Sequence, residues 1–182
     1  AKVESGQGPL SQEPVSLAEV MFECEGMVEP QARQRGVKMT FPRFDVPCFV
    51  RADRTRLKQV LINLLSNAIK YNVVQGTVAV HCSECAAGRV RVSIRDSGEG
   101  LGVEQLAQLF QAFNRLGKEA GSEEGTGIGL VVARRLVELM GGVIGVESTV
   151  GVGSVFWFEL GTVPEPLLSK QDAEAARLPQ AH

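Results

Sequence analysis

Two asparagines and a lysine are spaced so that they fall on one side of a helix. Asn63, Asn67 and Lys70 occupy positions i, i+4 and i+7 within residues 53–71, where apolar residues recur at helical spacing. An amide oxygen can ligate a hard cation such as Mg²⁺, and a lysine can neutralise a phosphate. On this helix alone, however, the solvated face of an amphipathic helix explains the three residues better than a binding site does.

Three glycine-rich clusters offer backbone N–H groups to an anionic ligand. Glycine permits a positive φ and a close approach of ligand to backbone, and a helix N-terminus favours phosphate. The clusters are D-S-G-E-G-L at 96–101 after a predicted strand, G-T-G-I-G-L at 125–130 opening a predicted helix, and G-V-G-S at 151–154 between two predicted strands. Each cluster alone could also be a tight turn, and this alternative is strongest for the third.

The clusters do not follow the common phosphate-binding motifs. Residues 117–119 read Gly-Lys-Glu, without the Ser or Thr that completes a P-loop. The dinucleotide-binding pattern G-x-G-x-x-G lacks its third glycine in each cluster, where Val103, Leu130 and Phe156 stand. The signature set of protein kinases is also absent.

The elements that must position these residues are helices and strands in mixed order. Ser16, in a capping box with Glu19, is expected to begin the first helix, Pro30 could kink or end it early, and Gly36 ends it. Helices are expected at residues 16–35, 53–71, 103–110 and 127–140, and strands at 37–41, 48–51, 77–84, 89–96, 143–148 and 153–160. Without a repeating βαβ rhythm, this order predicts an α/β two-layer sandwich, with one mixed β-sheet and helices packed on one face.

Length and composition indicate one globular domain. The chain has 182 residues, 44% of them hydrophobic and 22% charged. We expect a linker at residues 1–14, a domain at 15–162 and a flexible tail at 163–182. The net charge of −2 predicts neither nucleic-acid binding nor recruitment to anionic lipid, so an anionic ligand must be held by local geometry.

Neither a signal peptide nor a membrane span is evident, which favours a cytoplasmic location for this domain, whether or not a parent protein is membrane-anchored. Four cysteines are present, and Cys82 and Cys85 form a C-x-x-C pair. A zinc site needs a second pair at matching spacing, which Cys24 and Cys48 do not supply. Reduced, structural cysteines are therefore expected rather than metal or redox use.

The order of the motifs resembles that of the histidine kinase branch of the GHKL ATP-binding superfamily. Besides the three glycine clusters, N-L-L-S-N-A-I-K-Y at 63–71 resembles its asparagine box and L-F-Q-A-F-N-R-L at 109–116 its F-box. The match covers about residues 15–160, and five motifs in order are far more specific than any one of them. The resemblance implies the ATP-binding catalytic domain of a sensor histidine kinase, with ATP and Mg²⁺ as cofactors.

The resemblance also implies roles for residues of the first two motifs. Asp96 would accept a hydrogen bond from the adenine amino group, Gly98 and Gly100 would let the backbone pass close to the base and sugar, and Leu101 would be a further nucleotide contact. Asn67 would coordinate Mg²⁺ with Asn63 in support, Lys70 would contact phosphate, and Tyr71 would pack near the nucleotide.

Residues 114–126 would form a lid over ATP, with its near end anchored by Phe110 and Phe113. Arg115 would reach the phosphates or the partner domain. The remaining nucleotide contacts that the resemblance implies are Gly125, Thr126, Gly127, Ile128, Gly129, Leu130 and Ser154.

Asn63 separates the branches of the superfamily. ATPases such as gyrase and the mismatch-repair protein carry a glutamate near this position as a general base, whereas an amide cannot accept a proton at neutral pH. A GHKL ATPase, which Asn63 and the F-box disfavour, and a non-catalytic, nucleotide-gated interaction module are kept as alternatives. An anti-sigma serine kinase is a nearer relative than these two alternatives. The F-box with Arg115, however, fits the histidine kinase branch better.

The acceptor histidine expected of a complete histidine kinase has no counterpart in this sequence. His81 lies in a predicted strand and His182 is the last residue, whereas the family carries its acceptor on a helical hairpin. Residues 1–14 resemble the end of that hairpin, so the phosphoacceptor domain is expected upstream and a response regulator receiver domain as the next partner. Because dimerisation belongs to the hairpin, we expect an isolated monomer that binds ATP–Mg²⁺ without phosphorylating itself.

Overall fold

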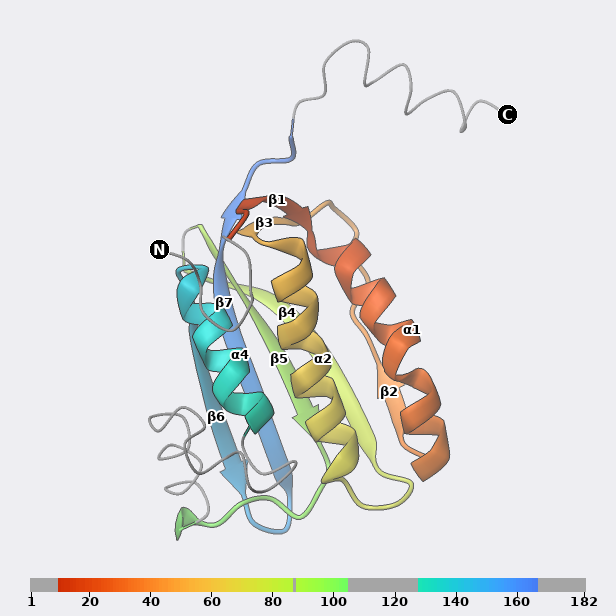
Figure 1. Ribbon diagram of the computed structural model, residues 1–182. Coiled ribbons are helices and arrows are strands. Elements are labelled where there is room, and N and C mark those ends of the chain that lie inside the picture. Colours follow the sequence, from red (N-terminus) through yellow and green to blue (C-terminus); the bar gives the residue numbers. More distant parts are fainter. Residues whose placement is uncertain (1–9, 87, 105–127, 167–182) are drawn as a thin grey trace, which may run out of the picture.

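One sheet with helices on one of its faces forms the part of the chain that the structure describes. The computed structural model describes residues 10–86, 88–104 and 128–166. Helices α1 (Leu17–Arg35), α2 (Arg54–Lys70) and α4 (Ile128–Leu139) lie side by side across the sheet (Figure 1). The strands are β1 (Glu13–Ser16), β2 (Lys38–Thr40), β3 (Phe49–Ala52), β4 (Thr77–Ala86), β5 (Arg89–Asp96), β6 (Val143–Thr149) and β7 (Gly153–Val163).

The sheet is mixed, which confirms the predicted fold class. Its order within the described ranges is β1-β3-β7-β5-β4-β2, with β6 pairing β7 as well. The pairing of β2 with β4 is parallel, and the other strand pairs are antiparallel. β7 pairs with β5 and β6 and, near its end, with β3, so the last strand joins the two halves of the sheet.

The first helix begins and ends at the residues that the sequence indicates. The Ser16 side chain accepts a hydrogen bond from the Glu19 N–H at 3.3 Å, which satisfies one of the free donors of the first turn. Gly36, with φ of 70°, ends the helix in the left-handed conformation that glycine adopts without strain. The helix continues through Pro30 to Arg35, so it does not end early.

β1 was not among the predicted strands. It begins at Glu13, within residues expected to form a linker, and pairs antiparallel with β3, Val15 opposite Val50. Both valines are buried, so the strand closes the edge of the core. Four residues with a single buried valine carry too little periodicity to be recognised before their partner strand is known.

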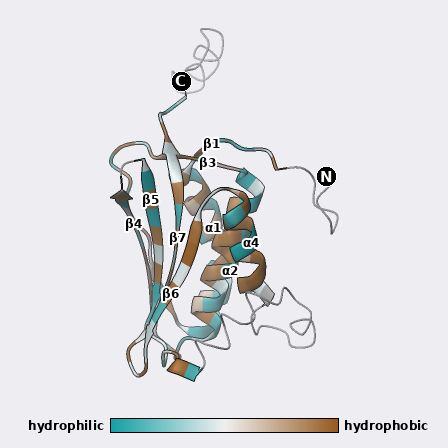
Figure 2. Cartoon of the chain, turned by 90° about the vertical axis from the view of Figure 1, so that its left-hand side faces the viewer, coloured by the Kyte–Doolittle hydropathy of each residue, from teal (hydrophilic) through white to brown (hydrophobic). Residues whose placement is uncertain are grey.

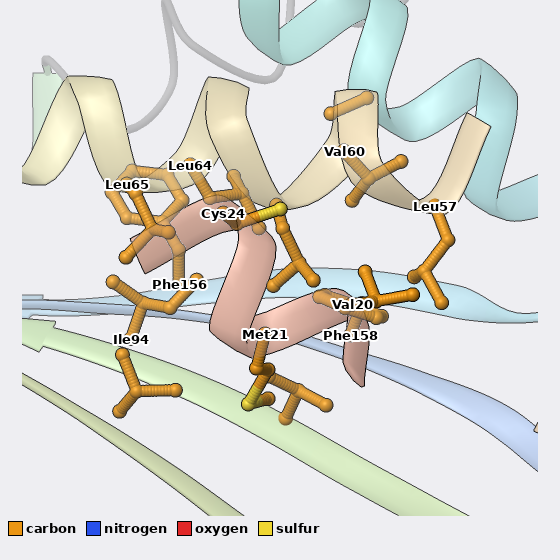
Figure 3. Packing of buried hydrophobic residues seen from close by; sticks show 14 of the residues in the cluster. Val20, Met21, Cys24, Leu57, Val60, Leu64, Leu65, Ile94, Phe156 and Phe158 are labelled. Carbon is orange, nitrogen blue, oxygen red and sulfur yellow. The ribbon is translucent and has the colours of Figure 1, made fainter. Parts of the chain in front are cut away.

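The core lies between the helices and the sheet. Along β5, buried Val90, Val92 and Ile94 alternate with three arginines and Ser93, which face away from the helices. Figure 2 shows this as bands of hydrophilic and hydrophobic colour along the strands. In Figure 3, Leu64 and Leu65 of α2 lie close to Phe156 of the sheet, with α1 packed beside them. The apolar stripe of α2 is thus the centre of the core.

The other face of the sheet has no helix over it among the described residues and carries a tryptophan. The Arg91 guanidinium lies 3.8 Å from the Trp157 ring centroid, and its Nε donates to a carboxylate oxygen of Glu159 at 2.9 Å. A Cβ at Gly145 would lie 2.3 Å from the ring, so the indole covers this residue of β6. Trp157 is thereby fixed between a glycine backbone and an arginine.

Gly26 of α1 offers a test of helix energetics. A Cβ at this exposed position would meet no heavy atom within 4 Å, so alanine fits without strain. Because glycine is the more flexible residue in the unfolded chain, we expect Gly26→Ala to stabilise the protein by about 1 kcal/mol. Thermal unfolding should then show a melting temperature raised by about 2–4 °C.

Gly36→Ala is the matched control, with the opposite sign expected. Its φ is positive and a Cβ would lie 3.2 Å from Gln75 Cγ, so alanine should lower the melting temperature. An unchanged or lowered melting temperature for Gly26→Ala would show that the native structure requires glycine at this position.

Candidate functional site

A buried carboxylate lies at the end of β5. Asp96 is 7% exposed, and its Oδ1 accepts backbone N–H groups from Gly98 at 2.9 Å and from Ser154 at 3.3 Å. Burial raises the pKa of Asp96, and these two donors partly oppose the rise. No donor to Oδ2 is found in the described ranges, so this oxygen is available to a donor on a ligand.

The loop after Asp96 is held by the turn between β6 and β7. The Leu101 N–H donates to Ser148 Oγ at 2.6 Å, and the Gly151 N–H donates to the Glu99 carbonyl at 2.8 Å. Gly100 has φ of 79°, and a Cβ there would lie 2.2 Å from the Thr149 carbonyl oxygen. Only glycine fits this approach, so the predicted cluster at 96–101 is more than a free turn.

The same loop also contacts the end of α2. A Cβ at Gly98 would lie 2.6 Å from the Tyr71 carbonyl oxygen, so the two predicted site residues meet backbone to backbone. The Tyr71 side chain is half exposed, and the Lys70 ammonium lies 5.4 Å from its ring centroid. Lys70, Tyr71 and the loop after Asp96 therefore border one region.

Asn72 holds this region together, although the sequence reasoning did not single it out. It is buried, and its Nδ2 donates to the Thr77 carbonyl at 2.9 Å. Its Oδ1 accepts from the Val73 N–H at 2.8 Å and the Ser97 hydroxyl at 3.1 Å. The one signal in the sequence is an asparagine directly after a helix, a residue favoured in turns, which gives no hint of its distant partners.

The polar stripe of α2 faces α4 rather than solvent alone. Asn63 Nδ2 donates to the Gly129 carbonyl at 3.2 Å and thereby fixes the first turn of α4 against α2. Asn67, one turn further along, is half-buried and has no side-chain hydrogen bond in the described ranges. The solvated-face interpretation thus fails for Asn63, while the amide of Asn67 remains available for a ligand.

The amide oxygen of Asn67 fits a Mg²⁺ ion that is bound mainly by other oxygens. No group of three or more His, Cys, Asp or Glu side chains that could hold a metal occurs in the described ranges. Mg²⁺ often takes one or two protein oxygens and completes its octahedron with substrate phosphates and waters. A single amide ligand therefore suits Mg²⁺ delivered with a nucleotide and does not suit an ion held by the protein alone.

Some predicted site residues lie outside the described residues. These are Phe110, Phe113, Arg115, Gly125, Thr126 and Gly127, together with the predicted lid at 114–126 and most of the predicted helix at 103–110. Of the neighbouring positions, Ile128 begins α4 and Leu130 is buried in the core. Ser154 is buried too, and its hydroxyl lies 2.7 Å from that of Ser148.

Residues 52–164 match the family described as histidine kinase-, DNA gyrase B-, and HSP90-like ATPase. The chain belongs to this family. Within the family, its relatives assign it to the ATP-binding catalytic domains of sensor histidine kinases.

Sensor histidine kinase GacS of Pseudomonas protegens is 37% identical over 96% of this chain and 19% of its own length. Sensor histidine kinase ZraS of Klebsiella oxytoca is 38% identical over 83% of this chain and 32% of its own length. The chain thus spans a third or less of these relatives.

Solved structures of histidine kinases share the fold. Full-length ShkA in complex with AMPPNP superposes with a TM-score of 0.72 at 32% identity, covering 87% of this chain and 33% of ShkA. The nucleotide-free catalytic domain of ThkA gives a TM-score of 0.69 at 29% identity, covering 83% of this chain and 95% of that domain. The fold is therefore that of the nucleotide-binding part of a histidine kinase.

The helices in the described ranges do not include one long and apolar enough to cross a membrane.

The four cysteines all carry free thiols, and burial raises the pKa of Cys24 to about 11 and that of Cys82 to about 12. Thiols with such pKa values are poor nucleophiles and poor metal ligands at neutral pH.

Asn72 should be a sensitive polar position outside the ligand contacts. Asn72→Ala leaves the Thr77 carbonyl, the Val73 N–H and the Ser97 hydroxyl without this partner, so we expect a loss of about 1–3 kcal/mol in the free energy of unfolding. Urea unfolding measures the loss. Val74→Ala, at a side chain 67% exposed, is the control and should change little; equal stability of the two variants would contradict the role given to Asn72.

Proposed function

We propose that this domain binds ATP with Mg²⁺ and donates the γ-phosphoryl group to a histidine on a phosphoacceptor domain of the same parent protein. That domain would pass the group to the receiver domain of a response regulator. The observation that carries the proposal is the Asp96 carboxylate, which is buried, held through one oxygen and left with the other for a donor. This site lies beside the end of the helix that carries Asn67 and Lys70.

The base and phosphate ends of ATP fit different parts of this region. Asp96 Oδ2 would accept the exocyclic amino group of adenine, which is a donor. The Asn67 amide oxygen would ligate Mg²⁺ between the phosphates, and the exposed Lys70 ammonium would offset their charge. The N-terminal turn of a helix favours phosphate, and the bond from Asn63 to the Gly129 carbonyl holds the first turn of α4 against the same helix.

The site favours transfer over hydrolysis. The Asn63 amide donates to a backbone carbonyl and cannot act as a base for water. Phosphoryl transfer needs little covalent chemistry from the protein beyond positioning and charge stabilisation, and a neutral imidazole is already nucleophilic. A GHKL ATPase is therefore disfavoured, and the presence of Asn67 and Lys70 on the phosphate side argues against a non-catalytic interaction module.

The position of His81 supports an acceptor on another domain. His81 lies on β4 between Val80 and Cys82, whose side chains point to the helix-covered side, so its own side chain points to the opposite face of the sheet. Asp96 faces the helices, because it continues the buried series Val92 and Ile94. Self-phosphorylation at His81 is therefore not expected. Arg115 and the predicted lid would complete the site on the side that meets the partner domain.

Asp96→Asn should weaken ATP recognition while preserving the fold. The asparagine oxygen can still accept from Gly98 and Ser154, but its amino group would face the adenine amino group, donor against donor. Calorimetric titration with ATP–Mg²⁺ should show at least a ~10-fold weaker affinity. Wild-type affinity in this variant would refute the assigned role.

The same variant should be more stable than the wild type without nucleotide. Burial raises the Asp96 pKa, so the ionised group costs the folded state, and that cost is absent below the ordinary carboxyl pKa. The stability advantage of the Asp96→Asn variant over the wild type should therefore grow as the pH rises and be complete above the native-state pKa. Thermal unfolding at acidic and neutral pH, without nucleotide, measures this difference.

Asn67→Ala should remove the Mg²⁺-dependence of nucleotide binding. Loss of an ion ligand typically costs at least ~10-fold in metal affinity, so ATP should bind the variant about equally with and without Mg²⁺. Gln59→Ala removes the same carboxamide from an exposed position of α2 and is the control. If nucleotide binding by Asn67→Ala depends on Mg²⁺ as strongly as nucleotide binding by Gln59→Ala does, the ion is held by other residues.

A further inference from the structure

We propose that Ser148 of β6 is a positioning residue for the base end of the nucleotide. Through its hydrogen bonds, Ser148 sets how strongly Asp96 prefers adenine over guanine. The inference rests on the proposed function of the site. It comes from the hydrogen bond that joins Ser148 to Leu101, at the far end of the loop that begins at Asp96, and from the contacts that link Ser148 through Ser154 to Asp96 itself.

Ser148 Oγ has three hydrogen-bond neighbours. The Leu101 N–H donates to it at 2.6 Å, the Ser154 hydroxyl lies 2.7 Å away, and the Gly153 carbonyl oxygen lies 3.2 Å away. A hydroxyl has one proton and two lone pairs. All three contacts are satisfied when Ser148 donates to Gly153 and accepts from Leu101 and Ser154.

Ser148, Ser154 and Asp96 form one row across three neighbouring strands. Ser148 of β6 lies opposite Ser154 of β7, and Ser154 lies opposite Asp96 of β5. The Ser154 N–H donates to Asp96 Oδ1 at 3.3 Å. Ser148 therefore acts on the carboxylate through its neighbour in the row.

The loop after Asp96 returns to the same hydroxyl. Asp96 begins the loop, Leu101 ends it, and the Leu101 N–H is held by Ser148. A closed path thus runs from Asp96 along the loop to Leu101, across to Ser148, and through Ser154 back to Asp96. Without the Ser148 hydroxyl, the far end of the loop and the Ser154 side chain each lose a partner.

Base preference depends on how well the carboxylate is held. Adenine presents an amino donor to Asp96 Oδ2, whereas guanine presents a carbonyl oxygen at the corresponding ring position, which the carboxylate repels. A fixed carboxylate discriminates strongly, because it cannot turn away from the wrong group. A loosened one binds adenine less well and rejects guanine less well.

The test compares Ser148→Ala with Ser148→Thr, which keeps the hydroxyl, and with Ser93→Ala. Ser93 lies on β5 three residues before Asp96, on the opposite face of the sheet, so Ser93→Ala makes the same chemical change away from the site. Calorimetric titrations with ATP and GTP, each with Mg²⁺, give the affinity ratio. Hydrogen exchange of the Leu101 amide in the free protein gives a readout independent of nucleotide.

Ser148→Ala should weaken ATP binding by about 3–10-fold, the usual effect of one hydrogen bond, and lower the ATP-to-GTP ratio. Its Leu101 amide should exchange faster, while Ser148→Thr and Ser93→Ala keep the wild-type ratio. A wild-type ratio in Ser148→Ala, whatever its melting temperature, would overturn the inference, and so would an equal fall in Ser93→Ala. If the wild type binds neither nucleotide, the proposed function itself fails.

Discussion

The candidate site depends on a carboxylate that is buried at the end of a strand without an ion partner among the described residues. Asp96 is held by two backbone N–H groups, one from its own loop and one from β7. Backbone donors suit this task because their positions are set by the sheet and not by flexible side chains. The register of β5 with β7, and of β7 with β6, therefore has to be correct before the site exists.

The carboxylate also shows how stability and binding oppose each other. Burial raises the Asp96 pKa, which means that the folded domain carries an unfavourable charge until a ligand supplies a donor. The apolar stripe of α2 and the closely packed sheet offset this cost, because they bury residues such as Leu64, Leu65 and Phe158 almost completely. The turn between β6 and β7 also holds the loop after Asp96, through the hydrogen bonds to Leu101 and Glu99.

How much could be predicted from the sequence depended on the range of each interaction. The helix that carries Asn67 followed from local periodicity, and the end of the first helix followed from Gly36, because both signals lie within a few residues. The mixed sheet followed from the order of elements and is confirmed. The roles of Asn67, Lys70 and Asp96 rest on motif order and stay predictions.

The partners of Asn72 and Ser148 could not be predicted, because they lie on other elements. A lone asparagine after a helix and a serine near a strand end are ordinary residues in a sequence. Their meaning comes from Ser97 in one case and from Leu101 in the other, which are distant in the sequence and brought near only by the folded sheet. β1 escaped prediction for the same reason, since its pairing with β3 defines it.

The placement of the indole has a spectroscopic consequence. The chain contains one tryptophan, Trp157, which lies against Gly145 and Arg91 on the sheet face opposite the helices, whereas Asp96 and α2 lie on the helix-covered side. The fluorescence emission of Trp157 therefore reports whether the sheet is folded. It should change little when a ligand binds near Asp96, on the opposite face of the sheet. Intrinsic fluorescence gives this domain a clean unfolding signal in which a ligand shifts the transition without altering the native baseline.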